Sequence, residues 1–290
     1  MPRKSAPPAK ATALAVPVQR VFTHTQLLDY LEKGDNGKQI RHDPNLPKLN
    51  ERQLIELVLA SGQVMRHELD TLFRCGPRYT WGDASVYELL RSLRPRGYLS
   101  HSSAAHAHGL TSGASKVVYW NDEQSPKPRS ETPPNQTRID TAFARRPRMS
   151  NNSATYRGQE ICILSGMHTA RLGVIEQRMP DGTIAPVTNL ERTLIDLAVR
   201  PAYGGGPSEV LACYRRAASK VSVKRMKSML AKLNYVYPYH QAIGFYLDRA
   251  GIADARLFRT IPQSFDFYLA HELKKRAYSR EWRVWYPGGL

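Results

Sequence analysis

The segment "PVTNLERTLIDLAVRPAYGGG", residues 186–206, contains the residue types of an active site. A Glu-Arg pair, an aspartate and a glycine cluster could supply acid-base chemistry and a phosphate-binding loop. The same spacing fits a helix with Thr188 as its N-cap and Glu191 completing a capping box. Arg192 and Asp196, four residues apart, would then pair on the exposed side of the helix. We therefore predict structural roles for these side chains and no catalytic residue.

Other residue patterns typical of chemistry are incomplete. The glycines at 204–206 are not followed by the Lys-Ser/Thr pair of a phosphate-binding loop. The histidines of "SHSSAAHAHGLT" have no zinc-site spacing and no carboxylate beside them, and the three cysteines form no Cys-x-x-Cys pair. In "DFYLAHELKK", Asp266, Glu272 and Lys274 fall on a helical pattern and lie too close together for a nuclease metal site. We expect no metal, no cofactor and no enzymatic activity.

Charge is the most informative property of the composition. The chain of 290 residues has 42 Lys and Arg against 25 Asp and Glu, a formal net charge of +17. Such an excess favours a polyanionic partner, because each neutralised phosphate releases counterions. Nucleic acid is the first hypothesis, ahead of a membrane surface or an acidic protein. No run approaches the ~18 apolar residues of a membrane span, and the opening residues lack a signal-peptide core, so we expect a cytoplasmic protein.

Residues 1–48 are expected to form a flexible basic arm that contains one short helix, in "VFTHTQLLDYLEKG". Residues 49–122 are expected to form a winged helix-turn-helix domain. "NERQLIELVLASG", "QVMRHELDTLF" and "DASVYELLRSLRPRGYLS" have helical apolar spacing, with Asn50 and Asp83 as caps. Three short helices running into a strand outline this DNA-binding motif, although no clear two-stranded wing follows. The third helix would enter the major groove. Its outward residues, and one just beyond it, are the predicted DNA contacts: Ser85, Tyr87, Arg91, Arg94 and Arg96.

A Pro-rich linker is predicted at 123–137, followed by a mixed α/β domain at 138–290. "EICILSG" and "LGVIEQRM" have strand patterns, and helices are expected near 190–199, 207–219, 222–233, 238–250 and 266–279. No acid occurs between Glu209 and Asp248. The cations gathered there could contact phosphates or an acidic protein: Arg215, Arg216, Lys220, Lys224, Arg225, Lys227 and Lys232. The tyrosines of "YVYPYHQAIGFYL" are expected mainly in the core.

Three segments together resemble the AbiEi family of bacterial type IV toxin–antitoxin antitoxins: "RGYLSHSSAAHAHGLT", "PVTNLERTLIDLAVRP" and "YGGGPSEVLACYRRA". The similarity spans roughly residues 50–250 and is clearest at 96–216. It implies an α+β protein that joins an N-terminal winged helix-turn-helix to an antitoxin domain. It further implies a repressor that binds double-stranded operator or promoter DNA and counters a nucleotidyltransferase-like toxin. The alternatives are a DNA-binding accessory of a mobile or phage-defence element, an RNA-binding or protein-neutralising module, and a metal-dependent nuclease.

Overall fold

The structure, a computed structural model, describes residues 16–33, 49–69, 75–113, 116–128 and 133–290. Helices and mixed sheets occur throughout these ranges, which confirms the predicted α+β class. The chain divides into two compact units. The N-terminal unit comprises the residues up to 95 together with 154–157, and the C-terminal unit comprises 96–153 and 158–290. The division therefore falls at 95–96 instead of after residue 122.

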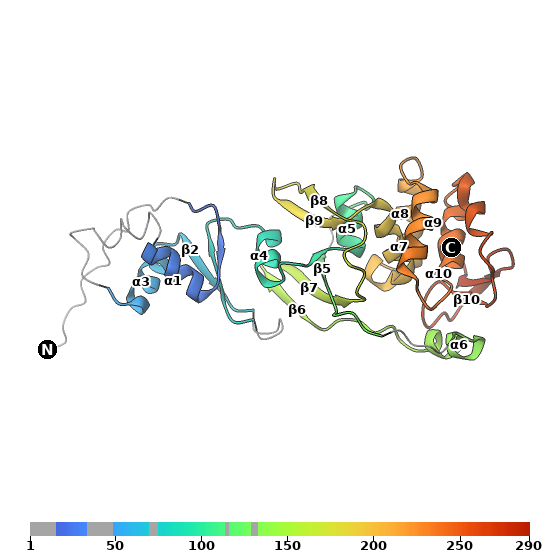
Figure 1. The fold of residues 1–290 in the computed structure, drawn as a ribbon, viewed down its shortest axis with the longest axis horizontal. Helices are drawn as coiled ribbons and strands as arrows, with labels where there is room; N and C mark the ends of the chain where they lie inside the picture. The colour runs from blue at the N-terminus through green and yellow to red at the C-terminus, as the bar shows by residue number, and fades with distance from the viewer. Residues whose placement is uncertain (1–15, 34–48, 70–74, 114–115, 129–132) are drawn as a thin grey trace. The chain divides into compact units, whose positions relative to one another are not determined.

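In its described ranges, the N-terminal unit contains three helices and a small sheet. Strands β1 (Val21–Phe22) and β2 (Val64–His67) both pair antiparallel with β3 (Arg78–Trp81), which gives the order β1-β3-β2. Helices α1 (His24–Lys33) and α3 (Glu51–Ala60) contact each other, and α4 (Val86–Leu93) contacts strand β1 (Figure 1). The apolar faces of α1 and α3 form one core with the sheet: Phe22, Leu27, Leu31, Leu54, Ile55, Val58, Val64, Tyr79 and Trp81.

Two predictions for this unit are wrong. The short helix expected in "VFTHTQLLDYLEKG" is confirmed as α1, but residues 16–33 are not part of a flexible arm, because Phe22, Leu27 and Leu31 are buried in the core. The rest of the predicted arm, 1–15 and 34–48, lies outside the described residues. "QVMRHELDTLF" was expected to be helical, but its start forms strand β2. Pairing with the aromatic and β-branched "RYTW" of β3 overrides the weak helical spacing, since strand formation depends on cross-strand partners.

The C-terminal unit contains a mixed sheet whose strands follow the order β7-β5-β4-β9-β8. Strands β5 and β7 run parallel, as do β4 and β9, whereas the β4–β5 and β8–β9 pairs are antiparallel. The predicted strands "EICILSG" and "LGVIEQRM" are confirmed as β7 and β8. The strands of this sheet are β4 (Tyr98–Leu99), β5 (Val117–Glu123), β7 (Gln159–Gly166), β8 (Val174–Arg178) and β9 (Ile184–Thr188). Strand β6 (Ser153–Tyr156) falls mostly in 154–157, the segment assigned to the N-terminal unit. The predicted linker begins where β5 ends, and helix α6 already occupies its last residues.

A helical cluster with α7 at its centre lies beside this sheet and contacts it through α5. Helix α7 contacts α5, α8, α9 and α10, and all its residues from 191 to 198 are buried (Figure 1). The predicted helices near 190–199, 207–219, 222–233 and 238–250 are confirmed. The helices are α5 (His101–Ala107), α6 (Gln136–Ala144), α7 (Leu190–Val199), α8 (Pro207–Ala217), α9 (Val223–Leu233) and α10 (Tyr239–Arg249), with short 3-10 turns at Pro201–Gly204 and Ala253–Phe258. None of the helices in the described ranges has the length and apolar composition that crossing a bilayer requires.

The end of the chain forms a second small sheet, so the helix predicted near 266–279 is wrong. Strand β12 (Val284–Pro287) lies between β10 (Phe267–Tyr268) and β11 (Arg276–Ser279). Phe267 is fully buried, and its backbone N–H donates to the carbonyl of Arg283. Pairing with the later strand β12 therefore overrides the local helical spacing of these residues. That spacing reflects only nearby residues and contains no information about a partner strand further along the chain.

Candidate functional site

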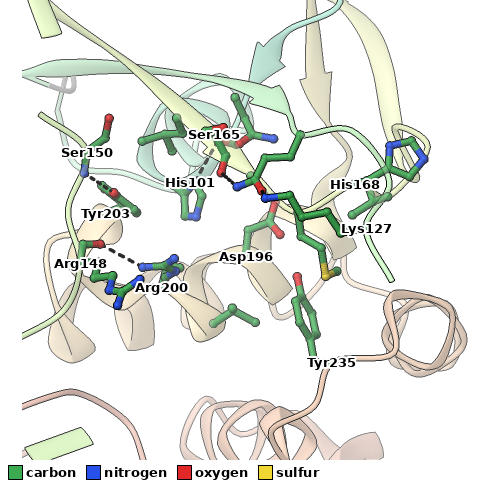
Figure 2. A pocket seen from close by; sticks show the side chains of 18 of the residues that line it. His101, Lys127, Arg148, Ser150, Ser165, His168, Asp196, Arg200, Tyr203 and Tyr235 are labelled. Atoms are coloured by element: carbon green, nitrogen blue, oxygen red, sulfur yellow. Dashed lines mark hydrogen bonds between the residues drawn. The ribbon is translucent and has the colours of Figure 1, made fainter. Parts of the chain in front are cut away.

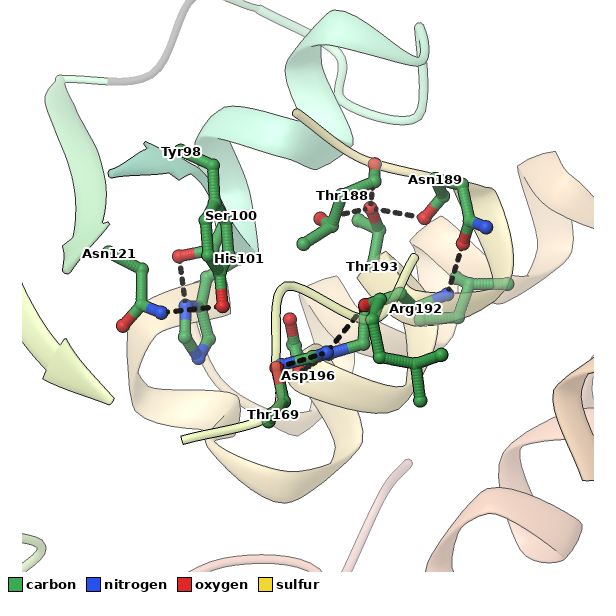
Figure 3. Close-up of polar contacts among 12 residues, drawn as sticks. Tyr98, Ser100, His101, Asn121, Thr169, Thr188, Asn189, Arg192, Thr193 and Asp196 are labelled. Atoms are coloured by element: carbon green, nitrogen blue, oxygen red, sulfur yellow. Dashed lines mark hydrogen bonds and ion pairs between the residues drawn. The ribbon is translucent and has the colours of Figure 1, made fainter. Parts of the chain in front are cut away.

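The segment that resembled an active site forms the start of α7, but not as predicted. The N-cap is Asn189, whose side-chain Oδ1 accepts the backbone N–H of Arg192 at 3.0 Å (Figure 3). Thr188 is fully buried and hydrogen-bonds Thr193 through their hydroxyls, 2.8 Å apart. The predicted Thr188–Glu191 capping box is therefore wrong, because burial takes the threonine hydroxyl away from the helix start.

Glu191 connects two helices instead of capping one. Its carboxylate is buried and accepts the backbone N–H of Ser222, the N-cap of α9, at 3.0 Å. The guanidinium of Arg225 lies 2.9 Å from the same carboxylate oxygen, while most of the arginine side chain stays exposed. The acid thus fixes the start of α9 against α7, and Arg225 neutralises it.

Arg192 and Asp196 pair as their spacing predicts, but the pair is buried and not on the exposed side. Their N–O distance is 2.8 Å, and their side chains are 5% and 8% exposed. Arg192 also donates to the carbonyl of Leu172 at 2.7 Å and to the hydroxyl of Thr169 at 3.3 Å. Burial opposes the charge on the guanidinium, yet the Asp196 carboxylate keeps its pKa above the ordinary value. The pair is a fixed charged element inside the unit.

A pocket of about 850 Å³ opens beside this pair (Figure 2). Its wall comes from the ends of β5 and β7, from the segments around residues 124–128 and 148–150, from α7, and from the turn between α9 and α10. Four Lys and Arg residues line it: Lys127, Arg148, Arg192 and Arg200. Asp196 is the one Asp or Glu in the lining that the structure describes, and it is paired with Arg192.

His101 forms a constrained part of the pocket wall. It is 9% exposed, and its φ of 51° places a non-glycine residue in the left-handed region. Its Nδ1 lies 2.9 Å from the Ser100 hydroxyl, and its ring meets the edge of Tyr203 at a centroid distance of 5.1 Å. Burial lowers the pKa of His101 to about 4, so the imidazole is neutral at pH 7. Its Nε2 forms no hydrogen bond within the described residues.

A hydrogen-bond network holds the neighbouring wall. The Asn121 amide donates to the hydroxyl of Tyr98 at 2.8 Å, and that hydroxyl donates to Glu123 at 2.8 Å. Thr169 donates its backbone N–H to the other oxygen of Glu123 at 2.9 Å. Burial would raise the pKa of Glu123, but hydrogen bonds from Thr169, Tyr98 and the Arg171 backbone lower it overall. The carboxylate therefore remains ionised and fixes the pocket segment that contains Thr169.

The predicted DNA contacts around α4 are only partly available. Ser85 is the N-cap of α4, and its hydroxyl accepts the N–H groups of Tyr87 and Glu88. Arg94 is half-buried and donates to the carbonyl of Leu93 at 2.9 Å. The other predicted contacts differ in exposure: Tyr87 is half-buried, whereas Arg91 and Arg96 are exposed. Arg96 also belongs to the C-terminal unit, so this set does not form one helical face.

The basic run of α8 and α9 also separates into two groups. Arg216 donates to the carbonyl of Leu110, Arg225 pairs with Glu191, and Lys227 donates to the hydroxyl of Thr260. The remaining cations are exposed and make no hydrogen bond or ion pair within the described residues: Arg215, Lys220, Lys224 and Lys232. Three of the seven predicted contacts therefore stabilise the unit itself, and four are available to a partner.

The histidines and acids considered for metal binding are dispersed. His106 hydrogen-bonds the Thr111 hydroxyl, and His108 the carbonyl of Thr188. Asp266 accepts from Tyr278 and Arg283, whereas Glu272 lies beside Arg146. Over the described ranges, no three His, Cys, Asp or Glu side chains come together in a way that could hold a metal ion.

Sequence reasoning did not identify the pocket. Its cations come from three separate segments, and the motif at 186–201, which contains Arg192 and Arg200, did not indicate that the other two segments lie beside it. The two signals available were the arginine cluster that includes Arg148 and the histidines that include His101. Neither indicated that these residues meet in space.

Comparisons with known proteins identify a fold. No family model matches the chain, and no curated protein matches it either. Among solved structures, the chain is similar to the crystal structure of the RV2827C protein from Mycobacterium tuberculosis, with a TM-score of 0.58 and 15% sequence identity. The match covers 92% of this chain and 86% of that protein. At this identity the likeness shows a shared overall fold, which includes both units.

Proposed function

We propose that this protein is a DNA-binding regulator of the antitoxin type, and that its N-terminal unit binds a DNA duplex. The order of elements in that unit carries the proposal. Helix α3 runs through a short turn into the β2–β3 hairpin, and β3 is the central strand of the β1-β3-β2 sheet. A helix followed by a two-stranded wing is typical of winged helix-turn-helix proteins, in which a recognition helix enters the major groove.

We propose α3 as the recognition helix, in place of the α4 segment predicted from spacing, because α3 is the helix that directly precedes the β2–β3 hairpin. The face of α3 opposite the core exposes Arg52, Gln53 and Glu56. Arg52 lies 2.9 Å from Glu56, but both side chains are largely exposed, so exchanging this pair for a DNA contact costs little. Arg66 on β2 supplies a second exposed cation, on the wing. The net charge of +17 adds affinity that does not depend on DNA sequence.

Binding to the DNA upstream of the protein's own gene tests the proposal. In a salt series of gel shifts, the full chain should bind that duplex, and its affinity should fall as salt rises. Arg52→Ala should lose about 1–3 kcal/mol of preference for the specific duplex over a scrambled one, the value of a bidentate base contact. Arg91→Ala on α4 is the matched control and should leave the preference unchanged. Loss of preference in the α4 variant alone would restore α4 as the recognition helix, and absence of duplex binding at low salt would exclude the function.

The C-terminal unit is proposed to add affinity for DNA that does not depend on the DNA sequence, and to counter a toxin. The four exposed cations Arg215, Lys220, Lys224 and Lys232 suit phosphate contacts. Neutralising Lys220 and Lys224 should weaken binding equally for all duplexes and reduce the salt dependence.

Action against a nucleotidyltransferase-like toxin rests on the sequence resemblance at 96–216. Co-purification with the product of an adjacent nucleotidyltransferase reading frame in the cytoplasm would support it.

A further inference from the structure

The pocket of the C-terminal unit has the features of a ligand site that DNA binding by the N-terminal unit does not use. Its volume of about 850 Å³ falls within the roughly 300–1,000 Å³ that small-molecule sites occupy. All of its lining belongs to one unit, and its residues come from strand ends, loops and helices that meet there. The question is which ligand class its side chains would recognise.

Charge favours an anion. Arg192 is neutralised by Asp196, which leaves Lys127, Arg148 and Arg200 as cations without an acidic partner in the described lining. Arg200 donates to the backbone carbonyl of Arg148 at 3.0 Å, so the two residues are held next to each other. Figure 2 shows both at one side of the pocket. Neighbouring guanidinium groups repel each other unless an anion lies between them, and phosphate accepts bidentate hydrogen bonds from arginine.

Apolar and aromatic side chains in the pocket favour a ligand that also has a flat, apolar part, such as an aromatic ring. Met149, Met167 and Val236 line the pocket and are 49%, 45% and 52% exposed. They are three of the eight large hydrophobic side chains that the structure describes as exposed, so apolar exposure is concentrated at this opening. Tyr235 and Tyr239 line the same region and meet edge to face, with ring centroids 5.2 Å apart. Such a surface gains free energy when it covers an aromatic ring.

Polar groups in the wall are already positioned for hydrogen bonding. His101 is buried and neutral, and its Nε2 has no partner in the described part of the chain, while its Nδ1 is held by Ser100. The left-handed backbone at this histidine is a costly conformation for a non-glycine residue, and such strain is concentrated at binding sites. Asn121 also lies in the wall and is oriented by Tyr98. These groups could distinguish the polar edge of a base or sugar.

We propose that the pocket binds a single nucleotide, with its phosphates at Arg148 and Arg200 and its ring against Tyr235, Met167 and Val236. Binding requires no covalent step. The proposal is independent of the DNA-binding function, since its site lies in the other unit and each can fail while the other holds.

Titration calorimetry with the full-length protein tests this proposal, with ATP, adenosine and inorganic triphosphate as probes. ATP should bind with a dissociation constant below about 1 mM, and each half alone should bind at least about tenfold more weakly. The double variant Arg148→Gln, Arg200→Gln should weaken ATP binding by at least about tenfold. The matched control is Arg256→Gln, Arg280→Gln, which removes two exposed cations outside the pocket and should leave ATP binding unchanged.

Each alternative result overturns a defined part of the inference. Absence of ATP binding excludes the site, and equal weakening by the control variant places binding elsewhere. Triphosphate as tight as ATP removes the role of the aromatic surface. A 5′-phosphorylated tetranucleotide that binds more tightly than ATP would show that the site takes the end of a nucleic-acid chain instead of a free nucleotide. Thermal unfolding of all variants, which should match the unsubstituted protein, confirms that they are folded.

Discussion

Two Arg-acid pairs with the same spacing illustrate how differently the two units use charge. Arg52 and Glu56 on α3 are 2.9 Å apart, with side chains 88% and 59% exposed. Arg192 and Asp196 on α7 are 2.8 Å apart, with side chains 5% and 8% exposed. An exposed pair is screened by water and contributes a few tenths of a kcal/mol, whereas a buried charge without its partner is very costly. Spacing predicts that each pair forms, but burial determines its energetic importance.

The same contrast applies to the two helices as a whole. Helix α3, the proposed recognition helix, packs one face into the core and leaves Arg52, Gln53 and Glu56 in solvent. Helix α7 is surrounded by four helices and uses its polar residues to fix α9 and the pocket. The unit that contains α7 also has the larger charge excess, 27 Lys and Arg against 15 Asp and Glu, compared with 15 against 10 in the N-terminal unit. Overall charge therefore does not identify the helix proposed to contact DNA.

The largest expected effect is the loss of the buried pair. Asp196→Ala leaves Arg192 charged and uncompensated, and should reduce the free energy of unfolding by about 3–5 kcal/mol. Glu56→Ala should cost only about 0.2–0.5 kcal/mol. Urea unfolding of both variants measures the difference. Equal losses would mean that burial does not distinguish the pairs. The double variant Arg192→Leu, Asp196→Leu should recover much of the loss, because it removes both charges together.

The next effect is a pH dependence that is larger in the C-terminal unit. Burial lowers the pKa of His101 to about 4, so between pH 6.5 and 4 the unfolded chain binds more protons than the folded one. The neutral imidazole makes its full contribution to the free energy of unfolding above pH 6.5. This contribution, roughly 3 kcal/mol, is lost as the pH falls to about 4. His101→Asn suits the left-handed backbone and should remove this loss in urea titrations at pH 7 and 4.5.

His67 provides the comparison in the N-terminal unit. Burial, with a smaller contribution from Arg157, lowers its pKa in the same direction, but the residue is only half-buried. His67→Asn should therefore change the pH dependence less than His101→Asn. A larger change in the His67 variant would contradict the assignment of the main acid-sensitive group to the pocket.

The smallest of these effects concerns acids in the first turn of a helix. Glu191→Gln weakens the buried contacts to the Ser222 backbone and Arg225, and should cost about 1–3 kcal/mol. Glu51→Gln changes an exposed acid in the first turn of α3, where only the helix dipole is involved, and should cost about 0.3–1 kcal/mol. Thermal unfolding would show the ranking. A reversed order would mean that Glu191 serves mainly as a helix-start charge, as its spacing predicted.

The sequence by itself determined the class of the fold, the charge excess and most helices of the C-terminal unit. The helices at 190–199, 207–217, 223–233 and 239–249 follow from apolar residues at helical spacing between clear stops, because this information is local. Only the tertiary structure determined that "QVMRHELDTLF" begins as a strand and that Phe267 joins the last sheet, since each strand is stabilised by a distant partner. Tertiary contacts likewise buried Asp196 and assembled the pocket, because neither burial nor proximity between distant segments is encoded in residue spacing.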